Sequence, residues 1–555
     1  QVRIGAKDVY NSGDKTDVLI AMNPSALKVN AQHLKNGSIV IYDVDSFKKR
    51  DLVKANINSD DPFTELNLNN IQQIAVPITS LTKASLEESG LENKDILRSK
   101  NMFALGLVCW LFNRPMEIAD KLLEQKFARR PKLIEANIKA LTDGYNYGEN
   151  LQLTATTYKI DVVESGKGFY MDVNGNTATA YGLIAAAEKA GIQLFLGSYP
   201  ITPATEILQE LTNRKDFGVK ALQMEDEIAG ITSAIGASFA GCLAATSTSG
   251  PGLSLKSEAL GLAVMAELPL VVIDVQRSGP STGMPTKSEQ TDLNQALYGR
   301  NGESPLVVIA ATTPIDCCES AYEASKLASE HMTPVILLTD GYIANGSSAW
   351  KIPDMNDYPP IIPPYVQHNF KGEIEEWKPF LRDDNTLVRY WGIPGTADYM
   401  HRIGGLEKDR YTGVISSNPE NHQYMVDTRK QKIENIANFI PEQNVLGDED
   451  ADTLIVGWGG TYGHLLETML HLHDSGKKVA LAQFKHISPL PKNTHELLKR
   501  YKKVIVAEQN SGQFAAYLNG KFQDLSNIRP FNRIEGQPFK VSELVEEFSK
   551  IMEEQ

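Results

Sequence analysis

Apolar residues occur along most of this chain in short continuous runs, separated by stretches in which they recur every three or four positions. A continuous run of four to eight apolar residues is typical of a strand in a parallel sheet that is covered on both faces. The recurrence every three or four positions predicts amphipathic helices. The alternation of the two predicts an α/β protein built on doubly wound, mostly parallel sheets.

The clearest alternation lies between residues 160 and 350. One stretch there places Ile228, Ile231, Ile235 and Phe239 along one face of a predicted helix. The runs that predict buried strands are Gln193–Leu196, Leu243–Thr246, Leu268–Val275, Leu306–Ala310 and Val335–Leu338. This region is therefore predicted to form one α/β domain.

Three further regions complete the predicted organisation. Residues 1–155 open with strands predicted at 18–22 and 37–42, a pattern that resembles the middle of an α/β domain, so we expect its start to be missing from the sequence. Residues 351–445 begin with a Pro-rich stretch, predicted to be a stiff extended connector, and continue as an irregular segment. Residues 446–555 return to an α/β pattern.

Composition excludes several classes of function. The chain has 55 basic and 69 acidic side chains, and a net charge of −14 argues against nonspecific binding to nucleic acid. No apolar run approaches the roughly 18 residues of a membrane span. The four cysteines, Cys109, Cys242, Cys317 and Cys318, are too scattered for a disulfide framework or a cluster-binding motif. We expect a cytoplasmic setting, no metal site on this chain, and any iron–sulfur cluster on a partner.

Candidate chemistry follows the predicted strands, because ligands of parallel sheets bind beyond the carboxyl ends of the strands. Thr202, in the segment 199–203, could hold a carboxylate or simply cap a helix. Glu225, Asp226 and Glu227 open the predicted helix, where the helix dipole alone favours acidic residues.

Two more loops of this kind carry candidates. Ser249 and Gly250 lie in a Gly-rich turn that could bring backbone amides close to a ligand or be a plain structural turn. Arg277 follows the strand predicted at 268–275 and suits bidentate recognition of a carboxylate, although a solvated loop arginine fits the same position. Each candidate, taken alone, is compatible with a structural role.

Taken together, four segments resemble the α-subunit of the 2-oxoacid:ferredoxin oxidoreductases: YPITPATE, QMEDEIAGITSAIGASFAG, TSTSGPGL and VQRSGPSTGMPT, at residues 199–206, 223–241, 246–253 and 275–286. Residues 401–413, 418–433 and 507–513 continue the resemblance. Residues 17–30 and 98–110 resemble the γ-domain that some members fuse ahead of α, and this fusion favours 2-oxoglutarate as the substrate. The Gly-rich turn that opens this γ-domain in the family is not found here.

The resemblance implies an activity and roles for named residues. It implies CoA-dependent oxidative decarboxylation of 2-oxoglutarate to succinyl-CoA and CO2, with ferredoxin as electron acceptor. Glu227 would hydrogen-bond the pyrimidine of thiamine diphosphate, and Thr202 and Arg277 would bind the carboxylate of the substrate. Further cofactor contacts would come from Tyr199, Pro200, Glu225, Ser249 and Gly250. Pyruvate or a branched or aromatic 2-oxoacid is the alternative substrate, and a noncatalytic scaffold subunit is the alternative role.

The usual diphosphate motif of thiamine enzymes, GDG after a strand with a later Asn, has no good match. The stretch 142–144 lacks the first glycine, and 339–341 lacks a suitably spaced asparagine. The family places the diphosphate, its Mg2+ and an iron–sulfur cluster on a separate β-subunit, in an (αβ)2 assembly. The resemblance thus implies a pyrimidine-binding domain at 160–350, a transketolase C-terminal-like domain at 446–555, and a thiamine diphosphate site shared with the partner.

Overall fold

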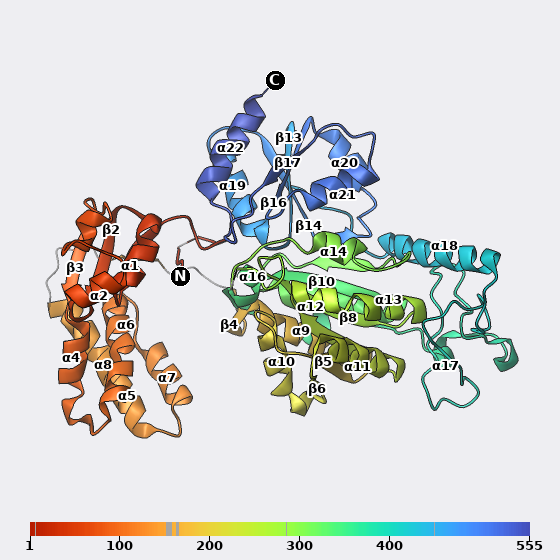
Figure 1. Ribbon diagram of the computed structural model, residues 1–555, viewed down its shortest axis with the longest axis horizontal. Coiled ribbons are helices and arrows are strands. Elements are labelled where there is room, and N and C mark those ends of the chain that lie inside the picture. Colours follow the sequence, from red (N-terminus) through yellow and green to blue (C-terminus); the bar gives the residue numbers. More distant parts are fainter. Residues whose placement is uncertain (6, 151–157, 162–165, 285, 449, 555) are drawn as a thin grey trace. The chain divides into compact units, whose positions relative to one another are not determined.

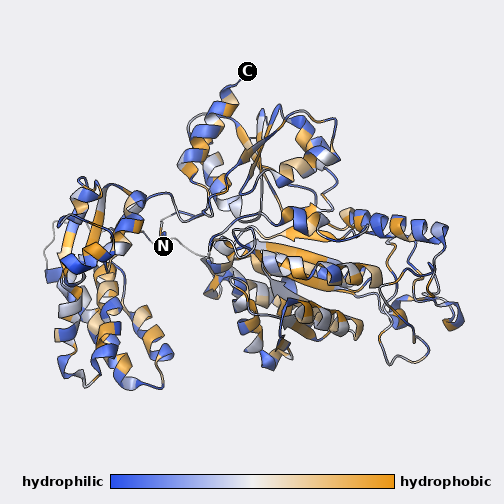
Figure 2. Ribbon diagram, in the orientation of Figure 1, coloured by the Kyte–Doolittle hydropathy of each residue, from blue (hydrophilic) through white to orange (hydrophobic). Residues whose placement is uncertain are grey.

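The computed structural model describes all residues except 6, 151–157, 162–165, 285, 449 and 555. It divides the chain into two compact units, Gln1–Ser165 and Gly166–Gln555. The predicted domain boundary at residue 155 lies outside the described residues. The inner strands of the sheets are largely apolar, and many helices combine hydrophobic and hydrophilic residues, as the hydropathy colouring in Figure 2 shows.

The first unit is built on a three-stranded parallel sheet in the order β1-β2-β3 (Figure 1). Two of its helices meet through glycines: a Cβ on Gly106 would lie 2.0 Å from the carbonyl oxygen of Leu141, and a Cβ on Gly144 would lie equally close to that of Phe103. The strands predicted at 18–22 and 37–42 are confirmed as β1 and β2. The elements are β1 (Thr16–Ala21), α1 (Pro24–Asn30), β2 (Leu34–Asp43), α2 (Lys49–Lys54), α3 (Pro62–Glu65), β3 (Gln72–Val76), α4 (Ile78–Ser85), α5 (Asn93–Arg98), α6 (Lys100–Leu111), α7 (Glu117–Lys126) and α8 (Pro131–Asn150).

The second unit is centred on a seven-stranded sheet in the order β15-β9-β10-β8-β7-β5-β6, parallel except for β15. Alternate strand residues enter two cores: Leu243 and Ala245 pack on one side of the sheet and Ala244 on the other. The predicted doubly wound fold is therefore confirmed. The strands are β5 (Leu194–Ser198), β6 (Lys220–Gln223), β7 (Leu243–Thr248), β8 (Leu270–Gln276), β9 (Val307–Ala310), β10 (Pro334–Asp340) and β15 (His486–Ser488).

Helices cover both faces of this sheet, and a two-stranded antiparallel ribbon of β4 (Tyr170–Asn174) and β11 (Ser347–Lys351) flanks it. Side chains of α9, α10 and α15 pack in one core, and those of α11 and α13 in the other. The helices are α9 (Gly175–Ala190), α10 (Thr205–Thr212), α11 (Glu227–Phe239), α12 (Gly250–Leu255), α13 (Ser257–Ala266), α14 (Leu293–Tyr298), α15 (Asp316–His331) and α16 (Gly341–Asn345).

The last part of the chain forms a five-stranded sheet in the order β12-β14-β13-β16-β17. Strand β15 leaves this part and pairs antiparallel with β9, so the two sheets of the second unit share a chain segment. The elements are β12 (Leu446–Gly447), β13 (Thr453–Trp458), α19 (Tyr462–Asp474), β14 (Val479–Phe484), α20 (Thr494–Arg500), β16 (Lys503–Glu508), α21 (Gln513–Lys521), β17 (Ile528–Asn532) and α22 (Val541–Glu553).

The segment predicted to be irregular up to residue 445 contains, besides the short α17 (Val366–Asn369), a long helix, α18 (Pro419–Asn435). The prediction was wrong here because α18 buries cations instead of an apolar stripe: Arg429 and Lys432 are buried beside Met425 and Ile433. A search for apolar periodicity therefore cannot find this helix.

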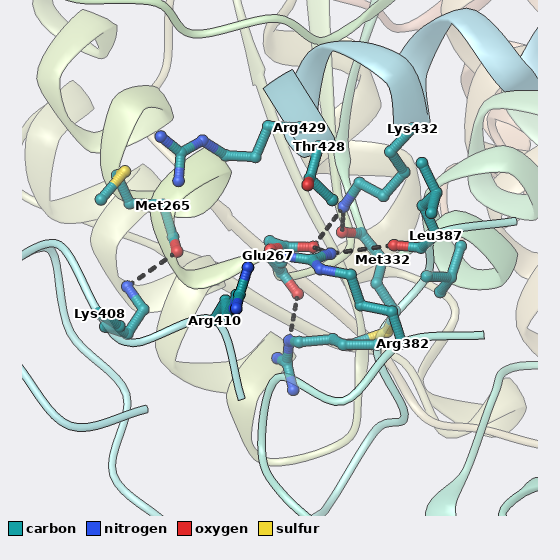
Figure 3. Close-up of polar contacts among 12 residues, drawn as sticks. Met265, Glu267, Met332, Arg382, Leu387, Lys408, Arg410, Thr428, Arg429 and Lys432 are labelled. Atoms are coloured by element: carbon teal, nitrogen blue, oxygen red, sulfur yellow. Dashed lines mark hydrogen bonds and ion pairs between the residues drawn. The ribbon is translucent and has the colours of Figure 1, made fainter. Parts of the chain in front are cut away.

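Two lysines of this region, Lys408 and Lys432, meet the carboxyl ends of two helices (Figure 3). Lys408 Nζ donates to the carbonyl of Met265 at the end of α13, at 3.0 Å, and Lys432 Nζ donates to that of Met332, just after α15, also at 3.0 Å. Between them Glu267 is ion-paired with Lys432, at 2.7 Å, and with Arg382. Positive charge is favourable at helix carboxyl ends, so this cluster holds the segment after β11 against the central sheet domain.

Several observations concern the described residues as a whole. None of their helices is both long and apolar enough to cross a bilayer. They contain no group of three or more His, Cys, Asp or Glu residues arranged to hold a metal ion. All four cysteines are free thiols, and burial raises the pKa of Cys318 to about 12.

Candidate functional site

The predicted site residues lie at one edge of the central sheet. Strands β6, β5, β7 and β8 are neighbours in that order and all parallel, so their carboxyl ends meet at the same edge. The segments that follow them contain Glu225 and Glu227, Tyr199 to Thr202, Ser249 and Gly250, and Arg277 respectively. The fold thus gathers four loops that are distant in sequence.

Thr202 and Arg277 are in direct contact. Nη1 of Arg277 donates a hydrogen bond of 2.7 Å to the carbonyl oxygen of Thr202. Thr202 itself does not cap a helix, because α10 begins at Thr205 with Ala204 at the N-cap position. The Thr202 side chain is exposed and Arg277 is half-buried with its Nε enclosed, so the Thr202 hydroxyl and Nη2 of Arg277 remain available to a carboxylate.

A buried asparagine that the sequence did not single out supports this turn. Nδ2 of Asn176, at the start of α9, donates to the carbonyl of Pro203 at 2.8 Å. Tyr199 and Pro200 precede the turn; Tyr199 is exposed and Pro200 is half-buried. Hydrogen bonds from Asn176 and from Arg277 therefore hold this turn in place.

Glu227 occupies the first turn of α11 without serving as its cap. That role belongs to Asp226, whose carboxylate accepts a 2.7 Å hydrogen bond from the backbone N–H of Ala229. Among the described residues none donates a hydrogen bond to the half-buried Glu227 carboxylate, whereas Glu225 is exposed just before the helix. Glu227 is thus a carboxylate held on a rigid element and free to bind a ligand.

The turn after β7 approaches these side chains closely because it contains glycines. Ser249 is the N-cap residue of α12, and its buried hydroxyl has no partner in the described part of the chain. A Cβ on Gly250 would lie 2.8 Å from both carboxylate oxygens of Asp292. A Cβ on Gly252 would lie 1.9 Å from Oγ1 of Thr248 and 2.9 Å from Cγ of Glu227.

Gly252→Ala should therefore displace Glu227 and impair the site. Overpacking of this kind costs about 1–3 kcal/mol of folding free energy, and we expect a loss of ligand affinity beyond the loss of stability. The matched control is Gly236→Ala, on the exposed face of α11, where a Cβ meets nothing within 4 Å. Equal ligand affinity in the two variants, measured by titration, would contradict this role of Gly252.

A buried carboxyl pair lies beneath Arg277 and was missed from the sequence. Burial and repulsion from Asp292 raise the pKa of Asp274, in β8, well above its usual range, and burial also raises the pKa of Asp292, before α14. Burial and the nearby Glu289 together raise the pKa of Asp292 to about 6, and Arg277 opposes the shift. The pair therefore carries less than two negative charges, and Arg277 keeps positive charge for an anion. The sequence feature that could have revealed this pair is an aspartate, Asp274, inside the apolar run of β8.

Lys256, between α12 and α13, was also missed from the sequence. It is fully buried, and its ammonium group donates to the carbonyl oxygen of Glu227 at 2.7 Å and to Oγ1 of Thr246 at 3.2 Å. Nothing in its local sequence distinguishes it from a surface lysine of an amphipathic helix.

Two family models match this chain. One, described as "Pyruvate flavodoxin/ferredoxin oxidoreductase, thiamine diP-bdg", matches residues 185–415 and so includes every site residue predicted from the sequence. The other, "Pyruvate ferredoxin/flavodoxin oxidoreductase", matches residues 1–147.

Curated proteins and solved structures agree with these models. The chain is 47% identical to 2-oxoglutarate oxidoreductase subunit KorA of Mycobacterium tuberculosis, over 98% of this chain and 82% of that protein. It is 30% identical to 2-oxoacid:ferredoxin oxidoreductase 1, subunit alpha, of Aeropyrum pernix, over 89% of this chain and 81% of the other. A structure of 2-oxoglutarate:ferredoxin oxidoreductase from Magnetococcus marinus, with 2-oxoglutarate, coenzyme A and succinyl-CoA bound, is similar with a TM-score of 0.85 and 31% identity, over 99% of this chain and 90% of that one.

Proposed function

Because this chain belongs to the 2-oxoacid:ferredoxin oxidoreductase family, we propose that it is the α-subunit of an enzyme that oxidises 2-oxoglutarate. The reaction converts 2-oxoglutarate and CoA into succinyl-CoA and CO2, and two electrons pass singly to ferredoxin. The observation that carries the proposal is the free carboxylate of Glu227 at the same sheet edge as the Thr202–Arg277 contact.

Thiamine diphosphate, when bound, supplies the carbon nucleophile for the 2-keto group and accepts the electron pair released with CO2. The residues of this chain fit its pyrimidine. A carboxylate without a hydrogen-bond donor, held in a first helical turn, can exchange a proton with a ring nitrogen. The buried Ser249 hydroxyl lacks a partner, and the glycines at 250 and 252 let a flat ring approach the backbone. We assign Tyr199, Pro200, Glu225, Ser249 and Gly250 to the walls of this site.

Thr202 and Arg277 bind the carboxylate next to the keto group in this proposal. The contact between them fixes the guanidinium, so less conformational freedom is lost when a substrate binds. The carboxyl pair of Asp274 and Asp292 leaves Arg277 incompletely neutralised. A carboxylate bound there would be oriented for loss of CO2.

The diphosphate, Mg2+ and an iron–sulfur cluster are assigned to a β-subunit, with an (αβ)2 assembly, ferredoxin as acceptor and a cytoplasmic setting. In support, large apolar side chains are exposed in the segments that follow the site strands, where a monomer would bury them. These are Tyr199, Ile228, Leu255 and Met284. No role is proposed for nucleic acid or membranes.

2-Oxoglutarate is preferred over pyruvate and over branched or aromatic 2-oxoacids because of two relatives. The Mycobacterium tuberculosis protein is named a 2-oxoglutarate oxidoreductase subunit, and the Magnetococcus marinus structure contains 2-oxoglutarate. At 47% identity over nearly the whole chain, nothing in the sequence calls for a substrate class different from that of this relative.

The test is viologen reduction under strict anoxia by the purified chain with its partner subunit. 2-Oxoglutarate, pyruvate and 2-oxoisovalerate are each offered with and without CoA. We expect CoA-dependent reduction that is fastest with 2-oxoglutarate. A complex that holds cofactor and cluster yet reduces viologen with none of the three would refute the enzyme function and favour a scaffold role. Faster reduction with another oxoacid would refute only the substrate.

The same assay tests Arg277. Arg277→Lys keeps the positive charge but removes the bidentate fork, so we expect KM for the oxoacid to rise about tenfold or more, as for the loss of one strong charge-assisted hydrogen bond. A smaller change in kcat is expected. An unchanged KM would show that Arg277 does not bind the substrate carboxylate.

A further inference from the structure

The ammonium group of Lys256 is enclosed beneath the first turn of α11. It contacts the Glu227 carbonyl and the Thr246 hydroxyl, and a Cβ on Gly230 would lie 3.4 Å from it. Three elements, α11, β7 and the α12–α13 junction, converge on one charge.

A fully buried lysine is costly for folding, since removing an ammonium group from water is not offset by two hydrogen bonds to neutral acceptors. The charged groups that act on it are the carboxylates of Glu227 and Asp226, both in or next to α11; Thr246 and Gly230 are uncharged. Burial lowers the pKa of Lys256 to about 8, and attraction to the two carboxylates opposes that shift. Residues that reduce stability in this way are concentrated at functional sites.

Given the proposed function, we propose that Lys256 is a positioning residue: it fixes the first turn of α11 through the Glu227 carbonyl and, by its charge, keeps the Glu227 carboxylate negative. When Glu227 is negative, the proton of the hydrogen bond between Glu227 and the pyrimidine stays on the ring nitrogen and not on the carboxyl group. Lys256 thus favours the protonated ring without touching it.

The experiment compares Lys256→Met, Lys256→Arg and wild type in the complete complex with its partner subunit. Lysine and methionine have similar lengths, so Lys256→Met fills the site without the charge. We expect its Tm to equal or exceed that of wild type, while kcat falls at least tenfold and KM changes less than threefold. Near-ultraviolet circular dichroism of the bound cofactor, a readout independent of turnover, should shift toward the unprotonated pyrimidine.

The pH profile supplies a second readout. In wild type we expect kcat to fall as pH rises through about 8, because the ammonium group loses its proton there. This limb should be absent in Lys256→Met and moved to higher pH in Lys256→Arg. The matched control is Lys408→Met: Lys408 is also buried, its pKa is also lowered to about 8 by burial, and it also bonds backbone carbonyls, but in the cluster around Glu267. Its removal should leave the dichroism unchanged.

The inference is overturned if Lys256→Met retains wild-type kcat and dichroism, or if its kcat falls only in proportion to a lowered Tm. If the proposed function is wrong, the wild-type complex will fail to reduce viologen with any of the three 2-oxoacids, and that outcome differs from failure of the Lys256 proposal. A wild-type complex that is active beside an unaltered Lys256→Met variant refutes the role of Lys256 alone.

Discussion

Replacement of Glu227 by glutamine should lower kcat by about 10²–10⁴-fold, the usual range for loss of an acid–base group. Glutamine has the same length but cannot exchange a proton with the pyrimidine. Because no described residue donates to the Glu227 carboxylate and Asp226 caps α11, the fold should tolerate the change. We therefore expect Tm within a few degrees of wild type and cofactor affinity reduced much less than kcat.

Two comparison variants make this prediction specific. Glu225→Gln tests the rival carboxylate two residues earlier, which is exposed and lies outside the helix, and should reduce kcat far less. Glu258→Gln removes an exposed carboxylate of α13 and should leave kcat unchanged. If Glu225→Gln loses more activity than Glu227→Gln, the two assignments must be exchanged.

The sequence was most informative where burial is apolar and regular. Five strands of the central sheet, β5, β7, β8, β9 and β10, were located to within two or three residues, because continuous apolar runs are what a sheet covered on both faces requires. The two edge strands were missed: β6 because its sequence, Lys220–Gln223, is half polar, and β15 because it is only three residues long. Helix α18 was missed because its buried face is cationic.

The site shows the same division. Arg277 and Thr202 were predicted as separate loop residues, and the rule that parallel strands end at one edge was enough to place them together. Lys256 and Asp292 could not be found in this way. Their importance arises from burial beside groups that are distant in sequence: Lys256 lies 29 positions from Glu227. A charged residue is predicted from the sequence to be exposed to solvent, and only the folded structure shows which charged residues are buried.

Glu267 provides the second large effect, on stability. It is 1% exposed and adopts a left-handed conformation with φ of 49° at the end of α13, a position that favours glycine. The side chain accepts hydrogen bonds from Arg382 and from Lys432 Nζ, the latter at 2.7 Å. Burial alone would raise the pKa of Glu267, but the two cations hold it well below its usual range.

Glu267→Gln should therefore lower the free energy of unfolding by about 3–5 kcal/mol, as expected when one partner of a buried ion pair is removed. The cause is the buried cations that remain, since Arg382, Arg389 and Lys432 would face helix carbonyls and each other without a carboxylate. Urea denaturation of the purified chain measures the loss. The control is Glu258→Gln on the same helix, where an exposed change should cost less than about 0.5 kcal/mol.

The pH dependence of this effect has a definite sign. Since the folded pKa of Glu267 lies below its value of 4.5 in the unfolded chain, its contribution is fully present above pH 4.5 and is lost as pH falls toward the folded pKa. Wild type and Glu267→Gln should therefore differ most near neutral pH and converge in acid. A difference that stays constant as the pH is lowered would mean that the lost stability comes from packing and not from the charge of Glu267. In that case cations and helix dipoles alone would hold the segment after β11 in place.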